Sequence, residues 1–207
     1  MPDTLRAIIM RYKIARSTTC LILAFFTLGS PKAEAVDDPV LEPFFIASAS
    51  YNRKLYPVAV DQFKKFLQSN PSHPKANLAR RGLGLSLYAL KLYDKAIPEF
   101  ATLLAKPNLD REIDRERLIM LQGRCMLYTG KRDDTRKLFI EQQKNLRNKT
   151  FKTAALATIC DISFEKSEWE MVIEWTAKLA QAGPEHTRST VLITGLQLHT
   201  RKNRQFW

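Results

Sequence analysis

The sequence predicts an all-α fold, a solenoid of about four stacked helical hairpins followed by a terminal helix. The first observation is a pattern that recurs at a spacing of about forty residues, and it is clearest at 82–100. There, a helix with Gly82 and Gly84 is followed by a short turn and a second helix with Ala96 and Phe100 four residues apart. The second observation is the composition, because only 7 Gly in 207 residues, with many Leu, Ala, Lys and Arg, favour helix over strand.

Residues 1–35 are expected to form a signal peptide rather than part of the fold. A basic stretch containing Arg6 and Arg16 precedes the eleven-residue apolar run 18–28. Ala33 and Ala35 then supply the small residues at −3 and −1 of a signal-peptidase site. We therefore expect cleavage after Ala35 and an exported, periplasmic or secreted protein.

Other readings of this segment stay open, namely an uncleaved signal anchor, an organelle transit peptide or a cytosolic tail. Eleven apolar residues span only about half of a ~30 Å hydrocarbon core, so no stable membrane span is expected after cleavage. Cys20 lies at the start of the apolar run, whereas a lipid-modified cysteine must follow such a run. The remaining chain is therefore expected to be soluble and not lipid-anchored.

The hairpins can be placed in order along residues 36–207. Pro57 suits the first turn of a helix, and the stretch 70–74 with its two prolines ends that helix. The expected helix pairs are 39–51 with 57–68, 78–88 with 93–106, 117–128 with 133–146, and 151–164 with 169–181, and a further helix begins near 188. The corresponding repeats are about 39–74, 75–110, 111–150 and 151–186, with a partial repeat at 187–207.

These repeats resemble the tetratricopeptide repeat (TPR) family. The matching residues are Leu83, Gly84, Tyr93, Ala96 and Phe100 in repeat two, Ala47, Tyr56, Ala59, Phe63 and Pro71 in repeat one, and Gly123, Gly130 and Phe139 in repeat three. Repeat four is degenerate, with Cys160, Trp169, Val172 and Thr176 at the corresponding positions. The resemblance implies a right-handed solenoid in which small residues let the two helices of a repeat approach closely. The linker 68–76 is similar to that of exported bacterial envelope TPR proteins.

The resemblance also implies a groove lined by the first helix of each repeat, in which a peptide or protein segment binds. Its expected partner-binding residues are Tyr51, Asn52, Arg81, Tyr88, Arg124 and Tyr128. Neighbouring groove positions are Phe45, Ser48, Leu78, Leu85, Arg117, Met120, Thr158, Asp161 and Glu165. Tyr88 and Tyr128 have an alternative role, which is to close the packing between helices.

The sequence carries no recognisable catalytic motif, so we expect neither an enzyme nor a bound cofactor or metal. His73, His186 and His199 are scattered, and no His-Glu-x-x-His or Cys-x-x-Cys pair is present. The charged run 110–117 is read as a solvated helix start whose acids pair with its arginines. Cys125 and Cys160 either form a disulfide or pack as small hydrophobic residues.

The charge balance leaves two functions open. The chain has a net charge of +12, and residues 1–35 hold five of its Lys and Arg and two of its Asp and Glu, so the remainder carries +9. This charge attracts anionic surfaces in general, but no aromatic residues interleave with the basic clusters to stack bases, so no nucleic-acid partner is expected. The main hypothesis is an exported adaptor that binds a protein segment. The alternative is a structural module, or a truncated part of a larger repeat protein, that self-associates through an uncapped C-terminal end and has no groove in use.

Overall fold

The chain folds as an all-α solenoid, as the sequence predicts. The computed structural model describes residues 39–182, in which eight α-helices and two short 3-10 helices occur and no strand is found. The helices pair as α2 (Glu42–Asn52) with α3 (Tyr56–Ser69), α4 (Ala76–Ala89) with α5 (Tyr93–Leu104), α6 (Arg115–Tyr128) with α7 (Arg132–Gln142), and α8 (Lys149–Glu165) with α9 (Trp169–Ala182). The 3-10 helices are Pro39–Leu41 and Gln143–Asn145.

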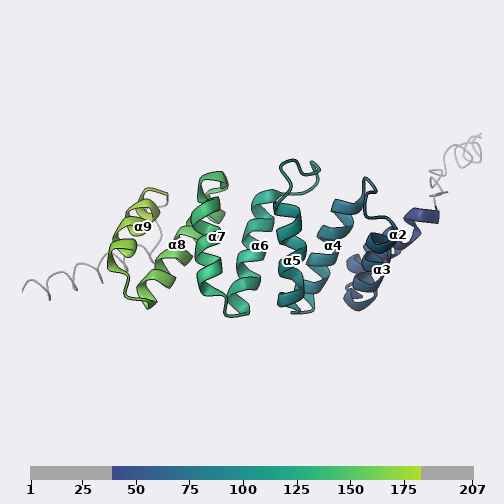
Figure 1. Cartoon of the computed structure of the whole chain (residues 1–207), viewed down its shortest axis with the longest axis horizontal. Helices are drawn as coiled ribbons and strands as arrows, with labels where there is room; N and C mark the ends of the chain where they lie inside the picture. Colours follow the sequence, from purple (N-terminus) through teal and green to yellow (C-terminus); the bar gives the residue numbers. More distant parts are fainter. Residues whose placement is uncertain (1–38, 183–207) are drawn as a thin grey trace, which may run out of the picture. The chain divides into compact units, whose positions relative to one another are not determined.

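Each helix packs against the next one along the chain, so the hairpins stack in sequence order (Figure 1). The chain divides into two units, Met1–Pro39 and Val40–Trp207, and the eight α-helices belong to the second. We call the first helix of each hairpin helix A (α2, α4, α6, α8) and the second helix B (α3, α5, α7, α9). Helices A also lie close to one another, as for α2 with α4 and α6 with α8.

Small residues on helices A let helices B approach, as the repeat pattern predicts. A Cβ added to Gly84 would lie 2.6 Å from a ring carbon of Phe100, and one added to Gly123 would lie 2.3 Å from a ring carbon of Phe139. In the fourth hairpin this contact has changed its chemistry, because Thr176 Oγ1 donates a hydrogen bond of 3.7 Å to Cys160 Sγ. The degenerate repeat thus replaces a glycine–phenylalanine contact by a thiol–hydroxyl contact at the same place.

The turns between helices A and B are equivalent in all four hairpins. One residue in each turn has a left-handed backbone, with φ of 62° at Lys54, 61° at Lys91, 76° at Gly130 and 58° at Ser167. The N–H of the following residue bonds back to the last turn of helix A, as from Leu92 to the Leu87 carbonyl at 2.9 Å. This geometry satisfies carbonyls that a helix end leaves unpaired. It also gives a structural register by which the hairpins can be aligned.

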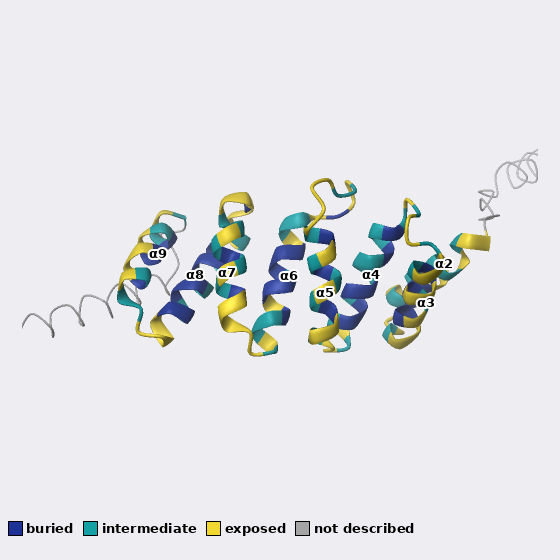
Figure 2. Cartoon of the chain, viewed as in Figure 1, coloured by how far each residue is buried: buried dark blue, intermediate teal, exposed yellow. Residues whose placement is uncertain are grey.

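The buried side chains form two clusters along the array. Figure 2 colours the buried positions of the helices dark blue. The first cluster is centred on the three phenylalanines Phe63, Phe66 and Phe100, and the second on Phe139, Ile159 and Trp175. Cys125 and Cys160 are buried as free thiols, one in each cluster. Of the two sequence readings for this pair, packing as small hydrophobic residues is therefore confirmed.

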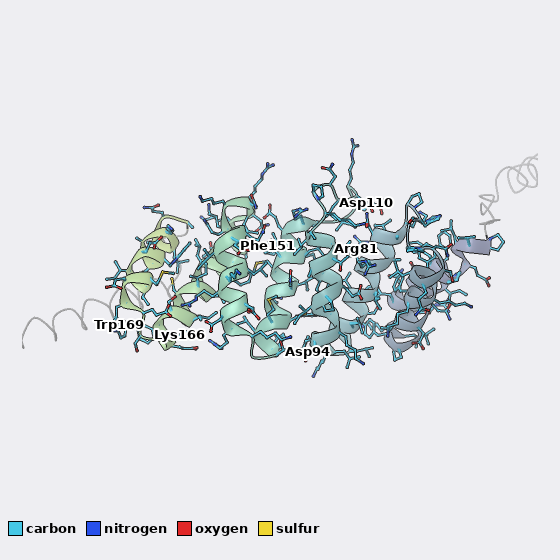
Figure 3. All side chains as sticks on the ribbon, viewed as in Figure 1. Arg81, Asp94, Asp110, Phe151, Lys166 and Trp169 are labelled. Carbon is cyan, nitrogen blue, oxygen red and sulfur yellow. The ribbon has the colours of Figure 1, made fainter. Side chains whose placement is uncertain are left out.

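Charged side chains connect successive hairpins along the edge formed by the A-to-B turns. Lys131 pairs with Asp94 at 3.0 Å, and Lys166 pairs with Asp133 at 2.5 Å. Asp94 and Asp133 each lie three residues after the left-handed turn residue, so they are equivalent positions. Figure 3 shows Asp94 and Lys166 along this edge. The basic residues Lys131 and Lys166 thus join successive hairpins.

The side chains of the charged run 110–117 make other contacts than the sequence predicts. Helix α6 begins only at Arg115, and the side chain of Asp114 caps it by accepting the N–H of Arg117 at 3.1 Å. No ion pair found in residues 39–182 joins an acid of this run to one of its arginines. Arg115 instead donates 2.9 Å to the carbonyl of Leu104, and Glu116 accepts the N–H of Asn148 at 2.8 Å. The prediction of a helix start is confirmed, whereas that of internal pairing is wrong, because nearby loops bind these side chains.

Candidate binding surface

The turn register shows which helix-A positions correspond between hairpins. The groove position one turn before the end of helix A is Ser48, Leu85, Arg124 or Asp161, depending on the hairpin. The position a further four residues earlier is Phe44, Arg81, Met120 or Ala157. These positions lie on one side of the array, which we call the helix-A face. We describe two hollows on this face that are lined by residues of 39–182.

The first hollow lies between α2 and α4 and encloses about 280 Å³. Its lining includes Tyr51, Asn52 and Arg81, three of the six predicted binding residues, together with the groove positions Ser48, Leu78 and Leu85. Phe63 of α3 is also in the lining, where Gly82 lies against it. A Cβ on Gly82 would come within 2.3 Å of the Phe63 ring, so this glycine keeps the space open. The sequence therefore predicts the residues of this hollow well.

Arg81 has a contact that the sequence does not reveal. Its guanidinium Nη1 donates a hydrogen bond of 2.6 Å to the backbone carbonyl of Glu112, in the loop between α5 and α6. Its Nε is buried without a hydrogen-bond partner. Arg81 is only partly exposed, and this bond ties the loop to α4. Figure 3 shows Arg81 on α4 and Asp110 in that loop.

The second hollow lies between α6 and α8 and encloses about 360 Å³. Of the predicted binding residues it contains Arg124, and of the neighbouring groove positions it contains Met120 and Thr158. Its floor is formed by Phe139 of α7 and Leu179 of α9, and its α8 wall by Ala154 and Ala157. Ala154 and Ala157 correspond to Leu78 and Arg81 of α4. Phe139 is 1% exposed and Leu179 is fully buried, whereas Ala154 and Ala157 are partly exposed, so short side chains form the accessible part of the α8 wall.

Sequence reasoning missed the α8 wall and the floor of the second hollow. Ala154 and Ala157 could have been found by writing the hairpins in register, because two alanines replace the longer side chains of earlier repeats. The floor residues Phe139 and Leu179 belong to the buried core, and nothing in their sequence neighbourhood marks them as part of a hollow. The residue of α6 equivalent to Gly82 is Leu121. It packs against the first core cluster, in which Phe100 is fully buried.

Tyr88 and Tyr128 lie at the turn edge and line neither of the two hollows. Tyr88 makes an edge-to-face contact with Tyr93, with ring centroids 5.5 Å apart. Equivalent contacts join Tyr51 to Tyr56 at 5.6 Å and Phe164 to Trp169 at 5.5 Å. Tyr88 thus packs the end of helix A on the start of helix B, which is the alternative role foreseen for it.

Tyr128 is not equivalent to Tyr88, contrary to the sequence alignment. Tyr88 lies three residues before its left-handed turn residue, whereas Tyr128 lies two before Gly130. Leu127 takes the position of Tyr88, and it lines the second hollow. Tyr128 is 62% exposed and stacks on Tyr93 of the preceding hairpin. The one-residue shift follows from Gly130, which adopts φ of 76° where the earlier turns use lysine.

The electrostatics of the surface follow from burial and from the ion pairs. Burial raises the pKa of the Cys125 thiol to about 11, and it also raises the pKa of Cys160. A hydrogen bond from Lys166 lowers the pKa of the Asp133 carboxyl. Arg124 is exposed, and within residues 39–182 its guanidinium makes no hydrogen bond or ion pair. It is therefore a free cation at the edge of an apolar hollow.

Neither a metal-binding cluster nor a membrane span occurs within residues 39–182. No group of three or more His, Cys, Asp or Glu in this range has a geometry suited to a metal ion. None of its helices combines the length and the apolar character that a membrane span requires. Ala33, Ala35 and the C-terminal helix expected from 188 lie outside the described residues.

Comparisons with known proteins support the fold. Neither a protein-family model nor a curated protein matches this chain in sequence. Among solved structures, the crystal structure of the apo form of RapI is similar, with a TM-score of 0.50 and 13% sequence identity. The alignment covers 99% of this chain and 80% of RapI. At this identity the likeness supports a helical-repeat fold and no more.

Proposed function

We propose that this chain is an exported adaptor, resembling the TPR proteins, which binds a segment of a partner protein on its helix-A face. The observation that carries the proposal is the position of the two hollows. Both open between successive helices A, and residues of these helices provide their walls. An extended segment that crosses several hairpins can place side chains in both, and this is how a stacked array presents one binding surface.

The chemistry of the linings supports a protein partner. The first hollow combines Phe44 and Leu78 with the hydroxyl of Tyr51 and the amide of Asn52. Apolar pockets bordered by a few polar groups are typical of sites that bind side chains and hold the backbone between them. The role proposed for the protein is therefore binding, and it requires no catalytic group.

The experiment is affinity capture by the full chain from the cells that produce it, followed by mass spectrometry. Ser48→Trp and Ala157→Trp fill the first and second hollow respectively, and Lys137→Trp places the same side chain on the exposed surface of α7. We expect partners that the wild type and Lys137→Trp retain at high salt and that the two filled variants lose. Partners captured equally by all four proteins would contradict binding on the helix-A face.

Export is a separate part of the proposal. The basic stretch, apolar run and small residues of 1–35 support it. N-terminal sequencing of the chain from its native cells should find Val36 as the first residue of the mature protein. A chain that retains residues 1–35 and stays in the cytosol would contradict export without affecting the proposed binding surface.

The alternative function is self-association through the C-terminal end of the array. The apolar residues Val191, Leu192, Ile193, Leu196 and Leu198 of the sequence favour it, because a cluster of this kind can be buried against a second copy of the chain. Light scattering of the full chain over a range of concentrations distinguishes the two functions. A concentration-dependent dimer that persists in Ser48→Trp and Ala157→Trp would favour self-association.

A further inference from the structure

The hollow between α6 and α8 differs from the first hollow in its electrostatics. Arg124 is the one charged side chain in its lining, and the rest is apolar apart from two threonines. In the first hollow, by contrast, Arg81 is already bonded to the loop, and Glu112 of that loop lines the same space. The second hollow is therefore an apolar space beside an uncompensated positive charge.

The acids of the surrounding helices do not neutralise this charge. Helix α6 has a single acid, Glu116, which accepts the N–H of Asn148. The acids of α8 are Glu165, which pairs with Arg132 at 2.7 Å, and Asp161, which also has a partner. Arg117 is a second exposed arginine, two turns before Arg124 on the same side of α6 and about 10 Å from it along the axis. The guanidinium of Arg117 makes no hydrogen bond or ion pair within residues 39–182.

The apolar part of the hollow has the size of a binding site. Its volume of about 360 Å³ lies within the usual range for ligand pockets, roughly 300–1,000 Å³. Its partly exposed apolar lining consists of Leu127 of α6 and of Ala154 and Ala157 of α8, and the buried Phe139 and Leu179 lie beneath them. Such a space has room for a large apolar side chain, whose burial favours a complex.

We infer that the second hollow binds an acidic–apolar element of a peptide, in which a large apolar side chain enters the hollow and a neighbouring Asp or Glu pairs with Arg124. This inference rests on the proposed function and names the chemistry of the partner segment. The apolar side chain packs on Leu127, Ala154 and Ala157, while the carboxylate stays at the partly exposed edge. Arg117 then attracts further acidic residues of the same segment. The α2–α4 hollow, whose arginine is already engaged, does not select for acids.

The test uses a displayed library of random twelve-residue peptides, fused through their C-termini so that no free carboxylate is present. The full chain is the target. We expect enriched peptides in which Trp, Phe, Leu or Met lies within two positions of Asp or Glu. A synthetic, amidated peptide of that consensus should bind about tenfold more weakly to Arg124→Glu and to Ala157→Trp than to the wild type. Lys137→Glu makes the same charge change on exposed α7 and should leave the affinity unchanged.

A second panning against Arg124→Glu sharpens the test, since this exposed substitution does not disturb the core. The preference should change from Asp and Glu to Lys and Arg, while the apolar residue is retained. Peptides without acids, or an unchanged preference in Arg124→Glu, would overturn the inference. Peptides whose binding is abolished by Ser48→Trp but not changed by Ala157→Trp would overturn the inference. The proposed adaptor function would remain intact.

The experiments give a different outcome if the chain does not act as an adaptor. No enrichment at all, together with no partner captured from the native cells, would overturn both proposals. Binding of a fluorescent fatty acid that Ala157→Trp abolishes, without any enriched peptide, would show that the hollow binds a lipid and would overturn the peptide inference.

Discussion

Tyr128 stacks on Tyr93 across two hairpins, with ring centroids 4.6 Å apart and ring planes inclined by 26°. Tyr93 is the first residue of α5 and Tyr128 the last residue of α6, so the contact joins the second hairpin to the third at their turns. The neighbouring ion pair of Lys131 with Asp94 joins the same two turns. A residue expected on the binding surface thus contributes to the packing of the array.

This geometry predicts that Tyr128→Ala changes stability and not binding. Loss of an aromatic pair costs about 0.5–1.5 kcal/mol of unfolding free energy beyond the area that it buries. Urea denaturation of the wild type and Tyr128→Ala should show this decrease, and both proteins should capture the same partners. A variant of unchanged stability that no longer captures a partner would return Tyr128 to the binding surface.

Gly123 should not tolerate a methyl group. A Cβ at this position would lie 2.3 Å from the ring of Phe139, which is 1% exposed and so has little room to move. Gly123→Ala should lower the unfolding free energy by about 1–3 kcal/mol through overpacking, even though alanine is the better helix former. Differential scanning calorimetry measures the loss, and Phe139→Leu in the same chain should restore part of it. Stabilisation by Gly123→Ala would show that α6 and α7 are not in this close contact.

The left-handed backbone of the turns predicts that Lys91→Gly and Gly130→Ala change the unfolding free energy in opposite directions. Lys91 has φ of 61°, a conformation that costs a residue with a Cβ about 1–2 kcal/mol. Lys91→Gly should therefore raise the unfolding free energy, by up to about 1 kcal/mol after the greater entropy of the unfolded glycine is counted. Gly130→Ala should lower it by a similar amount, although nothing lies within 4 Å of the position of the added Cβ. Chemical denaturation of the two variants checks the pair of signs, and effects in the same direction would contradict the turn geometry.

The buried thiol of Cys125 predicts a pH dependence at alkaline pH. Its pKa is about 11 in the folded protein, against an ordinary value of 9.0, so the folded state holds this proton more tightly than the unfolded state. The resulting stabilisation is complete below pH 9 and is lost as the pH rises towards 11. The difference in unfolding free energy between the wild type and Cys125→Ala should decrease over this interval, measured at a series of pH values. A difference that is constant from pH 8 to 11 would mean that the thiol is accessible in the fold.

Much of this fold can be predicted from the sequence, because its determinants are local. Gly84 and Phe100 lie sixteen residues apart in one hairpin, and their contact follows from the helical period and a short turn. Tyr51, Asn52 and Arg81 line the first hollow together for the same reason, because they belong to hairpins that match the family pattern well, and their role in binding stays a prediction.

The remainder depends on contacts that the pattern does not contain. The shift of Tyr128 relative to Tyr88 depends on which turn residue adopts a left-handed backbone, which is Lys91 in repeat two and Gly130 in repeat three. The engagement of Arg81 requires the path of the α5–α6 loop, which has no counterpart in the repeat. The second hollow is lined by residues of α6, α7, α8 and α9, with the short side chains of Ala154 and Ala157 on its α8 wall, so it becomes visible only when four helices are placed together.

Site-specific photocrosslinking tests the central claim most directly. A benzophenone amino acid is introduced in the full chain at Asn52 beside the first hollow, at Thr158 in the second, and at exposed Lys137 of α7 as the control. After irradiation of the native cells, we expect the same partner protein to be joined at Asn52 and at Thr158, with no product at Lys137. A partner that crosslinks at Lys137 and at neither hollow, or two copies of this chain joined at all three positions, would contradict binding of a protein segment on the helix-A face.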